Sequence, residues 1–60
     1  MRTELWYDKA FGMSLLVENA NGVLYIVDGW SDTCGRLPEE NAEQPIYEAA
    51  MSRLEKIADL

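Results

Sequence analysis

The first half of the chain alternates between apolar and polar residues with a period of two, which is the pattern of β-strands. Three such segments are predicted, at about residues 3–8, 13–18 and 23–28. The turn between the first two contains Gly12, and glycine takes positive φ without strain. Asn21-Gly22 separates the second and third segments, and this dipeptide favours a two-residue type I′ hairpin turn. The N-terminal half is therefore expected to be a three-stranded antiparallel meander.

The C-terminal segment instead repeats its apolar residues at intervals of three and four, which indicates an amphipathic α-helix over about residues 45–59. The apolar stripe consists of Tyr47, Ala50, Met51, Leu54, Ile57 and Ala58. Pro45 suits the first helical position, since proline lacks an N–H that would have no partner there. The two patterns together predict an α+β fold in a single domain, residues 1–60. It has a β-β-β meander, an acidic connector over residues 29–44 and one C-terminal α-helix packed on the sheet.

One helix can cover only one face of a three-stranded sheet. The covered face is expected to hold Leu5, Tyr7, Met13, Leu15, Val17, Leu24 and Ile26. The opposite face then carries Trp6, Leu16, Val23, Tyr25 and Val27. This apolar set is expected to exceed the roughly 300–600 Å² of a typical monomer's largest exposed patch. Two alternatives for the face remain open: the connector folds back with Trp30 and Leu37 over it, or another protein chain covers it.

Negative charge is concentrated in and around the connector. Residues 28–48 hold Asp28, Asp32, Glu39, Glu40, Glu43 and Glu48, with Arg36 as the single base. Five of the six net negative charges of the chain therefore lie in this segment. The acidic balance disfavours direct binding to nucleic acid or to a membrane surface, because few cations are clustered to replace counterions. The block is interpreted either as a solvated loop that maintains solubility or as a surface complementary to a basic partner.

Several functional classes lack the residues that they need. The chain has no histidine and one cysteine, Cys34, which removes the usual general base, an internal disulfide and a thiolate metal cage. Asp28 and Asp32 miss the ligand spacing of a calcium loop and are interpreted as strand-end and turn residues. A metal- or ligand-binding regulator would rest on these two alone. A 60-residue chain has room for one core and hardly for a deep cleft as well.

We therefore predict a protein that is not an enzyme and uses no metal or cofactor. No apolar run approaches the roughly 20 residues of a membrane span, and no signal-peptide pattern begins the chain. The lone cysteine is in keeping with a cytoplasmic location.

These features predict a small non-enzymatic protein-binding module, most concretely an inhibitor that occupies a basic nucleic-acid-binding surface of a partner protein. Its contacts would be Asp32, Glu39, Glu40 and Glu43, with Trp30 as an apolar anchor. In its size, its acidic block from Asp28 to Glu48 and its lack of a catalytic set, the chain resembles small phage-encoded inhibitors such as anti-CRISPR proteins and DNA mimics. The alternative is a structural or assembly module that homodimerises through an apolar face of Trp6, Leu16, Tyr25 and Val27.

Overall fold

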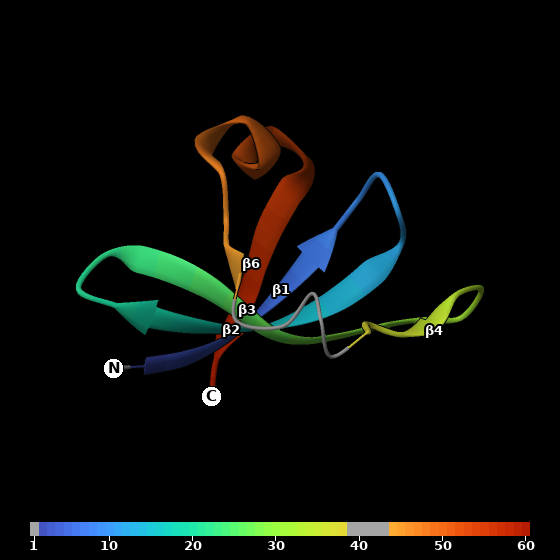
Figure 1. Cartoon of the computed structure of the whole chain (residues 1–60), viewed down its shortest axis with the longest axis horizontal. Coiled ribbons are helices and arrows are strands. Elements are labelled where there is room, and N and C mark those ends of the chain that lie inside the picture. The colour runs from blue at the N-terminus through green and yellow to red at the C-terminus, as the bar shows by residue number, and fades with distance from the viewer. Residues whose placement is uncertain (1, 39–43) are drawn as a thin grey trace.

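The computed structural model describes residues 2–38 and 44–60, and these form one curved antiparallel sheet around a small core (Figure 1). The strands are β1 (Arg2–Asp8), β2 (Met13–Ala20), β3 (Val23–Ser31), β4 (Gly35–Arg36), β5 (Gln44–Pro45) and β6 (Leu54–Asp59). Their order is β4-β3-β2-β1-β6, and β5 also pairs with β3. A 3₁₀ helix, η2 (Glu48–Arg53), links β5 to β6. Neither described range holds a helix long and apolar enough to cross a lipid bilayer.

The β2–β3 hairpin follows directly from its turn sequence. Asn21 has a φ of 54° and Gly22 a φ of 87°, and a type I′ turn requires positive φ at both positions. Ala20 is therefore opposite Val23, and the two strands pair along their length. The side-chain oxygen of Asn19 accepts a hydrogen bond from the Gly22 N–H at 2.9 Å, which further stabilises the turn. The predicted hairpin is confirmed, and all three predicted strands are present in slightly longer form.

The prediction of an α+β fold is wrong, because residues 45–59 do not form an α-helix. Pro45 belongs to β5, Glu48–Arg53 form the 3₁₀ helix and Leu54–Asp59 form β6. β6 pairs antiparallel with β1 and so satisfies backbone groups along an edge that would otherwise be open. This long-range pairing prevails over the helical periodicity of the segment, which reports only local preference. The described residues thus form a six-stranded sheet with little helix.

The connector returns to the edge of β3 that faces away from β2. Gly35–Arg36 pairs with Trp30–Ser31 at one end of β3, and Gln44–Pro45 pairs with Tyr25–Ile26 at the other. The Leu37 N–H extends the first pairing with a hydrogen bond to a β3 carbonyl at 2.6 Å. Short strands therefore cover this edge, which reduces the number of unpaired backbone groups that it exposes.

β1 presents its side chains to the faces opposite to those predicted. Directly opposed residues of an antiparallel pair lie on the same face of a sheet, and Trp6 is opposite the core residue Leu15. The inner face therefore receives the even-numbered residues of β1, which are Arg2, Glu4, Trp6 and Asp8. Leu5 and Tyr7, which were expected to be covered, lie on the outer face. The inward facing of the apolar residues in β2 and β3 was predicted correctly.

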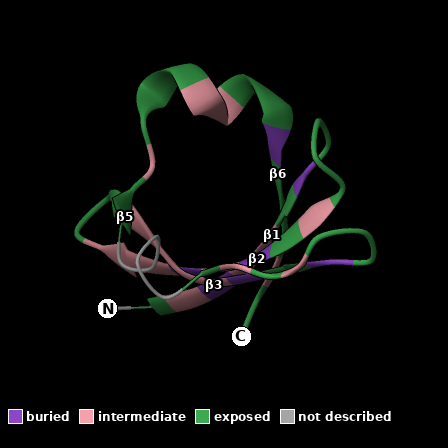
Figure 2. Ribbon diagram, turned by 45° about the vertical axis from the view of Figure 1, so that its right-hand side comes forward, coloured by how far each residue is buried: buried purple, intermediate pink, exposed green. Residues whose placement is uncertain are grey.

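The core on the inner face is small, and the sheet bends around it. Leu15, Val17 and Leu54 are buried, and they are packed against by Trp6, Met13, Leu24, Ile26, Ile46 and Met51. Register shifts leave Val27 of β3 and Ile57 of β6 as extra residues in their strand pairs, and such bulges increase the local bend and twist. Figure 2 shows the result: the strands curve upward on both sides, and η2 lies across from β2 and β3.

Candidate functional site

The outer face of the sheet carries two aromatic side chains on either side of a small residue. Tyr7 of β1 is opposite Ser14 of β2, and Ser14 is opposite Trp30 of β3. The three positions therefore form one row across the sheet. A hollow of about 170 Å³ lies beside Trp30, where the short serine side chain leaves space. The hollow is lined by Leu5, Ser14, Leu15, Leu16, Asp28, Gly29 and Trp30.

The two tryptophans occupy very different environments. Trp30 is 56% exposed on the outer face, whereas Trp6 packs against the core. The hypothesis that the connector folds back with Trp30 and Leu37 over the outer face is therefore wrong for the described residues. Leu37 instead lines a second cavity, on the inner side of the sheet. The indole of Trp30 is left available to a partner, and aromatic side chains contribute strongly when a contact buries them.

Asp28 lines the hollow on the outer face and is held by Arg36. The Nε and Nη2 atoms of Arg36 donate hydrogen bonds to its two carboxylate oxygens at 3.1 and 2.8 Å. The Gly29 N–H donates a third at 2.8 Å. The hydrogen bonds from Arg36, and after them the one from Gly29, lower the pKa of Asp28 below its usual value of 3.8. The carboxylate is thus charged at neutral pH, and with both oxygens engaged it is poorly placed to ligate a cation.

The turn after β3 contains an acidic residue, Asp32, that follows Trp30 by two positions. The Ser31 hydroxyl accepts a hydrogen bond from the Cys34 N–H at 2.9 Å, which stabilises the turn. Asp32 and Cys34 are both exposed in this turn. Of the predicted partner-binding residues, Trp30 and Asp32 therefore share one end of the sheet. Glu39, Glu40 and Glu43 lie outside the described residues.

The four residues of the predicted dimer face do not share one surface. Leu16 is opposite Leu5, and Tyr25 is opposite Glu18, so both belong to the outer face. Val27 is the extra residue of the β2–β3 bulge. Trp6 lies on the inner face, because β1 faces the other way from the prediction. Any interface on the outer face would therefore use Tyr7 of β1 where Trp6 was expected.

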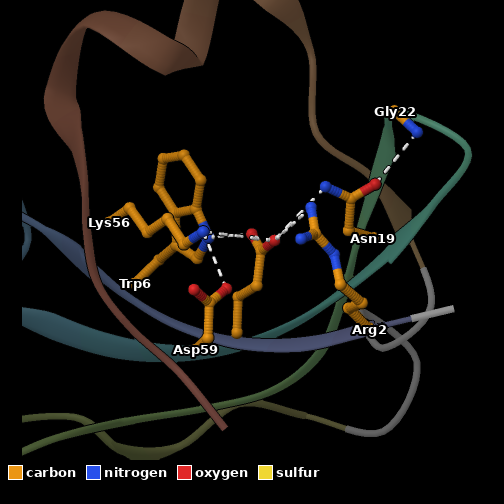
Figure 3. Close-up of polar contacts among 7 residues, drawn as sticks. Arg2, Trp6, Asn19, Gly22, Lys56 and Asp59 are labelled. Carbon is orange, nitrogen blue, oxygen red and sulfur yellow. Dashed lines mark hydrogen bonds and ion pairs between the residues drawn. The ribbon is translucent and has the colours of Figure 1, made fainter.

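Sequence reasoning missed a buried carboxylate on the inner face, Glu4, whose partners Figure 3 shows. The indole N–H of Trp6 donates to Glu4 Oε1 at 2.8 Å, and the side-chain amide of Asn19 donates to Oε2 at 3.2 Å. Lys56 Nζ lies 3.5 Å from Oε2. The Trp6 hydrogen bond is the largest cause that lowers the pKa of Glu4; burial opposes it, and Asn19 and Lys56 add to it. A charged carboxylate is thereby accommodated beside the core.

A second buried carboxylate, Asp8, lies at the other end of β1. Arg53 Nε donates to Asp8 Oδ2 at 3.0 Å, and Oδ1 accepts the backbone N–H groups of Ala10 and Phe11 at 2.9 and 3.2 Å. Both carboxylates thus connect β1 to the C-terminal segment, through Lys56 and Arg53. The alternation of Glu4, Trp6 and Asp8 was the only local sign of this arrangement, because Asp8 and Arg53 are 45 positions apart in the chain.

The described residues form a small, mostly β-sheet protein with a hollow beside Trp30 on the outer face of the sheet. Within residues 2–38 and 44–60, no three side chains of the metal-ligating types come together. Comparisons with protein-family models, with curated proteins and with solved structures found no match.

Proposed function

We propose that this protein is a non-enzymatic protein-binding module that inhibits a nucleic-acid-binding protein by occupying its basic surface. The proposal rests chiefly on Trp30, which is exposed beside an apolar hollow at the end of the sheet where the acidic connector begins. Aromatic side chains near the centre of an interface supply much of its affinity. Charges around them increase the association rate and set the orientation.

The charge distribution supports a basic partner. The chain has a net charge of −6, and five of these charges lie in residues 28–48. Like charge repels nucleic acid, so the protein would compete for a basic surface and would not bind nucleic acid itself. A cytoplasmic location belongs to the same proposal, because the lone Cys34 forms no disulfide and suits a reducing compartment.

The test captures partners on immobilised protein from a host-cell extract, with washes at graded salt and with competing DNA or RNA in parallel. We expect the retained protein to bind nucleic acid and to be released by both salt and competitor. Replacing Glu39, Glu40 and Glu43 by glutamine should weaken binding at low salt and flatten its salt dependence. Trp30→Ser should weaken binding about tenfold or more at every salt concentration, because it removes an apolar contact.

A matched control keeps the number of removed charges equal. Glu39→Gln/Glu40→Gln should weaken binding more than Glu48→Gln/Asp59→Asn, since Glu48 belongs to η2 on the inner side and Asp59 is opposite the inner-face residue Glu4. A partner that is insensitive to nucleic acid, or that binds both double variants equally, would contradict the proposal.

The second candidate is a homodimer formed through the outer face. Val23 and Tyr7 are exposed on that face, and Leu16 and Tyr25 lie on the same face, so it offers an apolar contact surface. Sedimentation at micromolar concentration should then give a dimer, and Leu16→Glu should give a monomer, because charge would be placed in the contact. A monomeric wild-type protein would eliminate this candidate.

A further inference from the structure

The inner side of the sheet holds a cavity of about 450 Å³, open on one side. It is lined by Leu15 and Ile26 of the sheet and by Ile46 and Ala50 from the segment between β5 and β6. The volume falls within the range of about 300–1,000 Å³ that small-molecule sites occupy. The cavity is open to solvent, so it differs from the deep cleft for which a 60-residue chain was expected to have little room. Its lining is mostly apolar, which suits an apolar body and leaves few hydrogen-bonding groups to fix its orientation.

One end of the cavity has a positioned cation, Arg53. Its Nε atom donates to the buried Asp8 at 3.0 Å, and its guanidinium lies 5.4 Å from the centre of the Phe11 ring. These two contacts hold the planar group in place. Its Nη atoms donate no hydrogen bond to any residue that the structure describes. The side chain is 44% exposed, so these donors can be reached from solvent.

We propose that this cavity binds a small amphipathic molecule whose head group accepts hydrogen bonds, such as a fatty-acid-like carboxylate. The apolar body would lie against Leu15 and Ile26, and the head group would accept two parallel hydrogen bonds from the Nη atoms of Arg53. Asp8 keeps its own bond to Nε, so the ligand does not displace it. The proposal is independent of the partner-binding function, because it uses the opposite face of the sheet.

Two other occupants are less suited to the cavity. Residues 39–43 read Glu-Glu-Asn-Ala-Glu, which contains no large apolar side chain to fill an apolar space. A second copy of the chain would bring a further net charge of −6 against the same charge on the first. A small amphipathic carboxylate brings an apolar body and a single negative charge, which the guanidinium of Arg53 can neutralise.

The test titrates the intact protein with sodium octanoate and follows the methyl resonances of Leu15, Ile26 and Ile46 by NMR. We expect saturable shifts at these methyl groups. Octylamine, which has the same tail and a cationic donor head, should bind at least about tenfold more weakly, because its head group cannot accept hydrogen bonds. Equal affinities, or shifts confined to Tyr7 and Trp30 on the outer face, would overturn the proposal.

Two variants separate the apolar and polar parts of the site. Ala50→Leu fills the cavity and should lower octanoate affinity about tenfold or more, whereas Ala49→Leu on the same 3₁₀ helix should bind as the wild type does, since Ala49 does not line the cavity. Arg53→Lys keeps a cation beside Asp8 but loses the planar fork, and should cost about tenfold for octanoate and nothing for octylamine. Unchanged octanoate binding in either Ala50→Leu or Arg53→Lys would refute the assignment.

Discussion

The two faces of the sheet hold charged and aromatic side chains in an unusual distribution. The inner face encloses two carboxylates, Glu4 and Asp8, beside a core in which three apolar side chains of residues 2–38 and 44–60 are buried. The outer face exposes Trp30 and Tyr7 to solvent. Each inner carboxylate has a cation from the C-terminal segment within 4 Å, which compensates for the loss of water around it.

This contrast shows what determines the facing of β1. Leu5 and Tyr7 would be natural core residues by hydrophobicity alone, yet they lie outside. The inner position of Trp6 gives its indole N–H a buried acceptor in Glu4, and Lys56 supplies the opposite charge. Polar links to β6 therefore set the orientation of this strand, and the aromatic residues left outside form the surface available to a partner.

The largest difference in stability between the two faces is expected when two neighbouring leucines, which point to opposite faces, are each truncated to alanine. Leu15→Ala should lower the free energy of unfolding by about 2–5 kcal/mol, because Leu15 is only 3% exposed and its loss leaves a void in the core. Leu16→Ala, on the outer face, should cost about 1 kcal/mol. Urea denaturation at neutral pH measures both. Equal losses would show that the two faces are equally packed.

A smaller effect is expected where β3 passes close to the core. A Cβ atom at Gly29 would lie 3.0 Å from Leu15 Cδ2 and 3.2 Å from Met13 Sδ. Gly29→Ala should therefore destabilise the protein by about 1–3 kcal/mol, as overpacking does. Ser14→Ala is the matched outer-face change, in the neighbouring strand and exposed, and should stay within about 0.5 kcal/mol. A neutral Gly29→Ala in the same urea assay would contradict the close approach of Leu15 and Met13 to Gly29.

The two faces should also differ in their response to acid. The pKa of Glu4 is lowered in the folded protein, so its contribution to stability is present above its usual pKa of 4.5 and is lost as the pH falls through the folded value. Glu4→Gln should therefore be less stable than the wild type at pH 7, with the difference shrinking below pH 4.5. The urea midpoint measured from pH 7 to pH 3 tests this.

Asp28 provides the outer-face comparison for the acid response. Its pKa is lowered in the same direction from 3.8, chiefly by Arg36, but its side chain is 35% exposed and the pair is screened by water. Asp28→Asn should therefore change the pH profile less than Glu4→Gln does. A larger change for Asp28→Asn would contradict this account, because it would mean that the outer-face carboxylate contributes more to stability than Glu4 does.

These contrasts explain which parts of the structure could be predicted from the sequence. The Asn21-Gly22 hairpin was predictable because the φ requirement of its turn is local. The strand at residues 54–59 was not, because its pairing with β1 depends on contacts about 50 residues apart that no local period encodes. The facing of β1 was predicted wrongly for the same reason, because Lys56 and Arg53, the cations that pair with Glu4 and Asp8, come from that distant segment.

The same limit applies to the candidate site. Trp30 and Asp32 could be singled out from composition and charge, and both are exposed in the structure. The hollow beside Trp30 could not, because it depends on the register that places Ser14 opposite Trp30. The cavity beside Arg53 depends on the 3₁₀ helix, which the helical pattern of the segment concealed.

The smallest effect on stability is expected at the residue that matters most for the proposed function. Trp30→Ser should change the free energy of unfolding by no more than about 0.5 kcal/mol, because the indole is largely exposed. Trp6→Phe should destabilise measurably, since it removes the N–H that Glu4 accepts. Thermal unfolding followed by circular dichroism compares the two. A large loss for Trp30→Ser would mean that this side chain serves the fold.

The most direct test of the account is the solvent accessibility of each tryptophan. Trp30→Phe leaves Trp6 as the only indole, and Trp6→Phe leaves Trp30. Fluorescence quenching by acrylamide, a neutral quencher that the protein's charge does not repel, should then be strong for Trp30 and weak for Trp6. The reverse order, with Trp6 quenched readily and Trp30 protected, would contradict both the facing of β1 and the proposed binding surface.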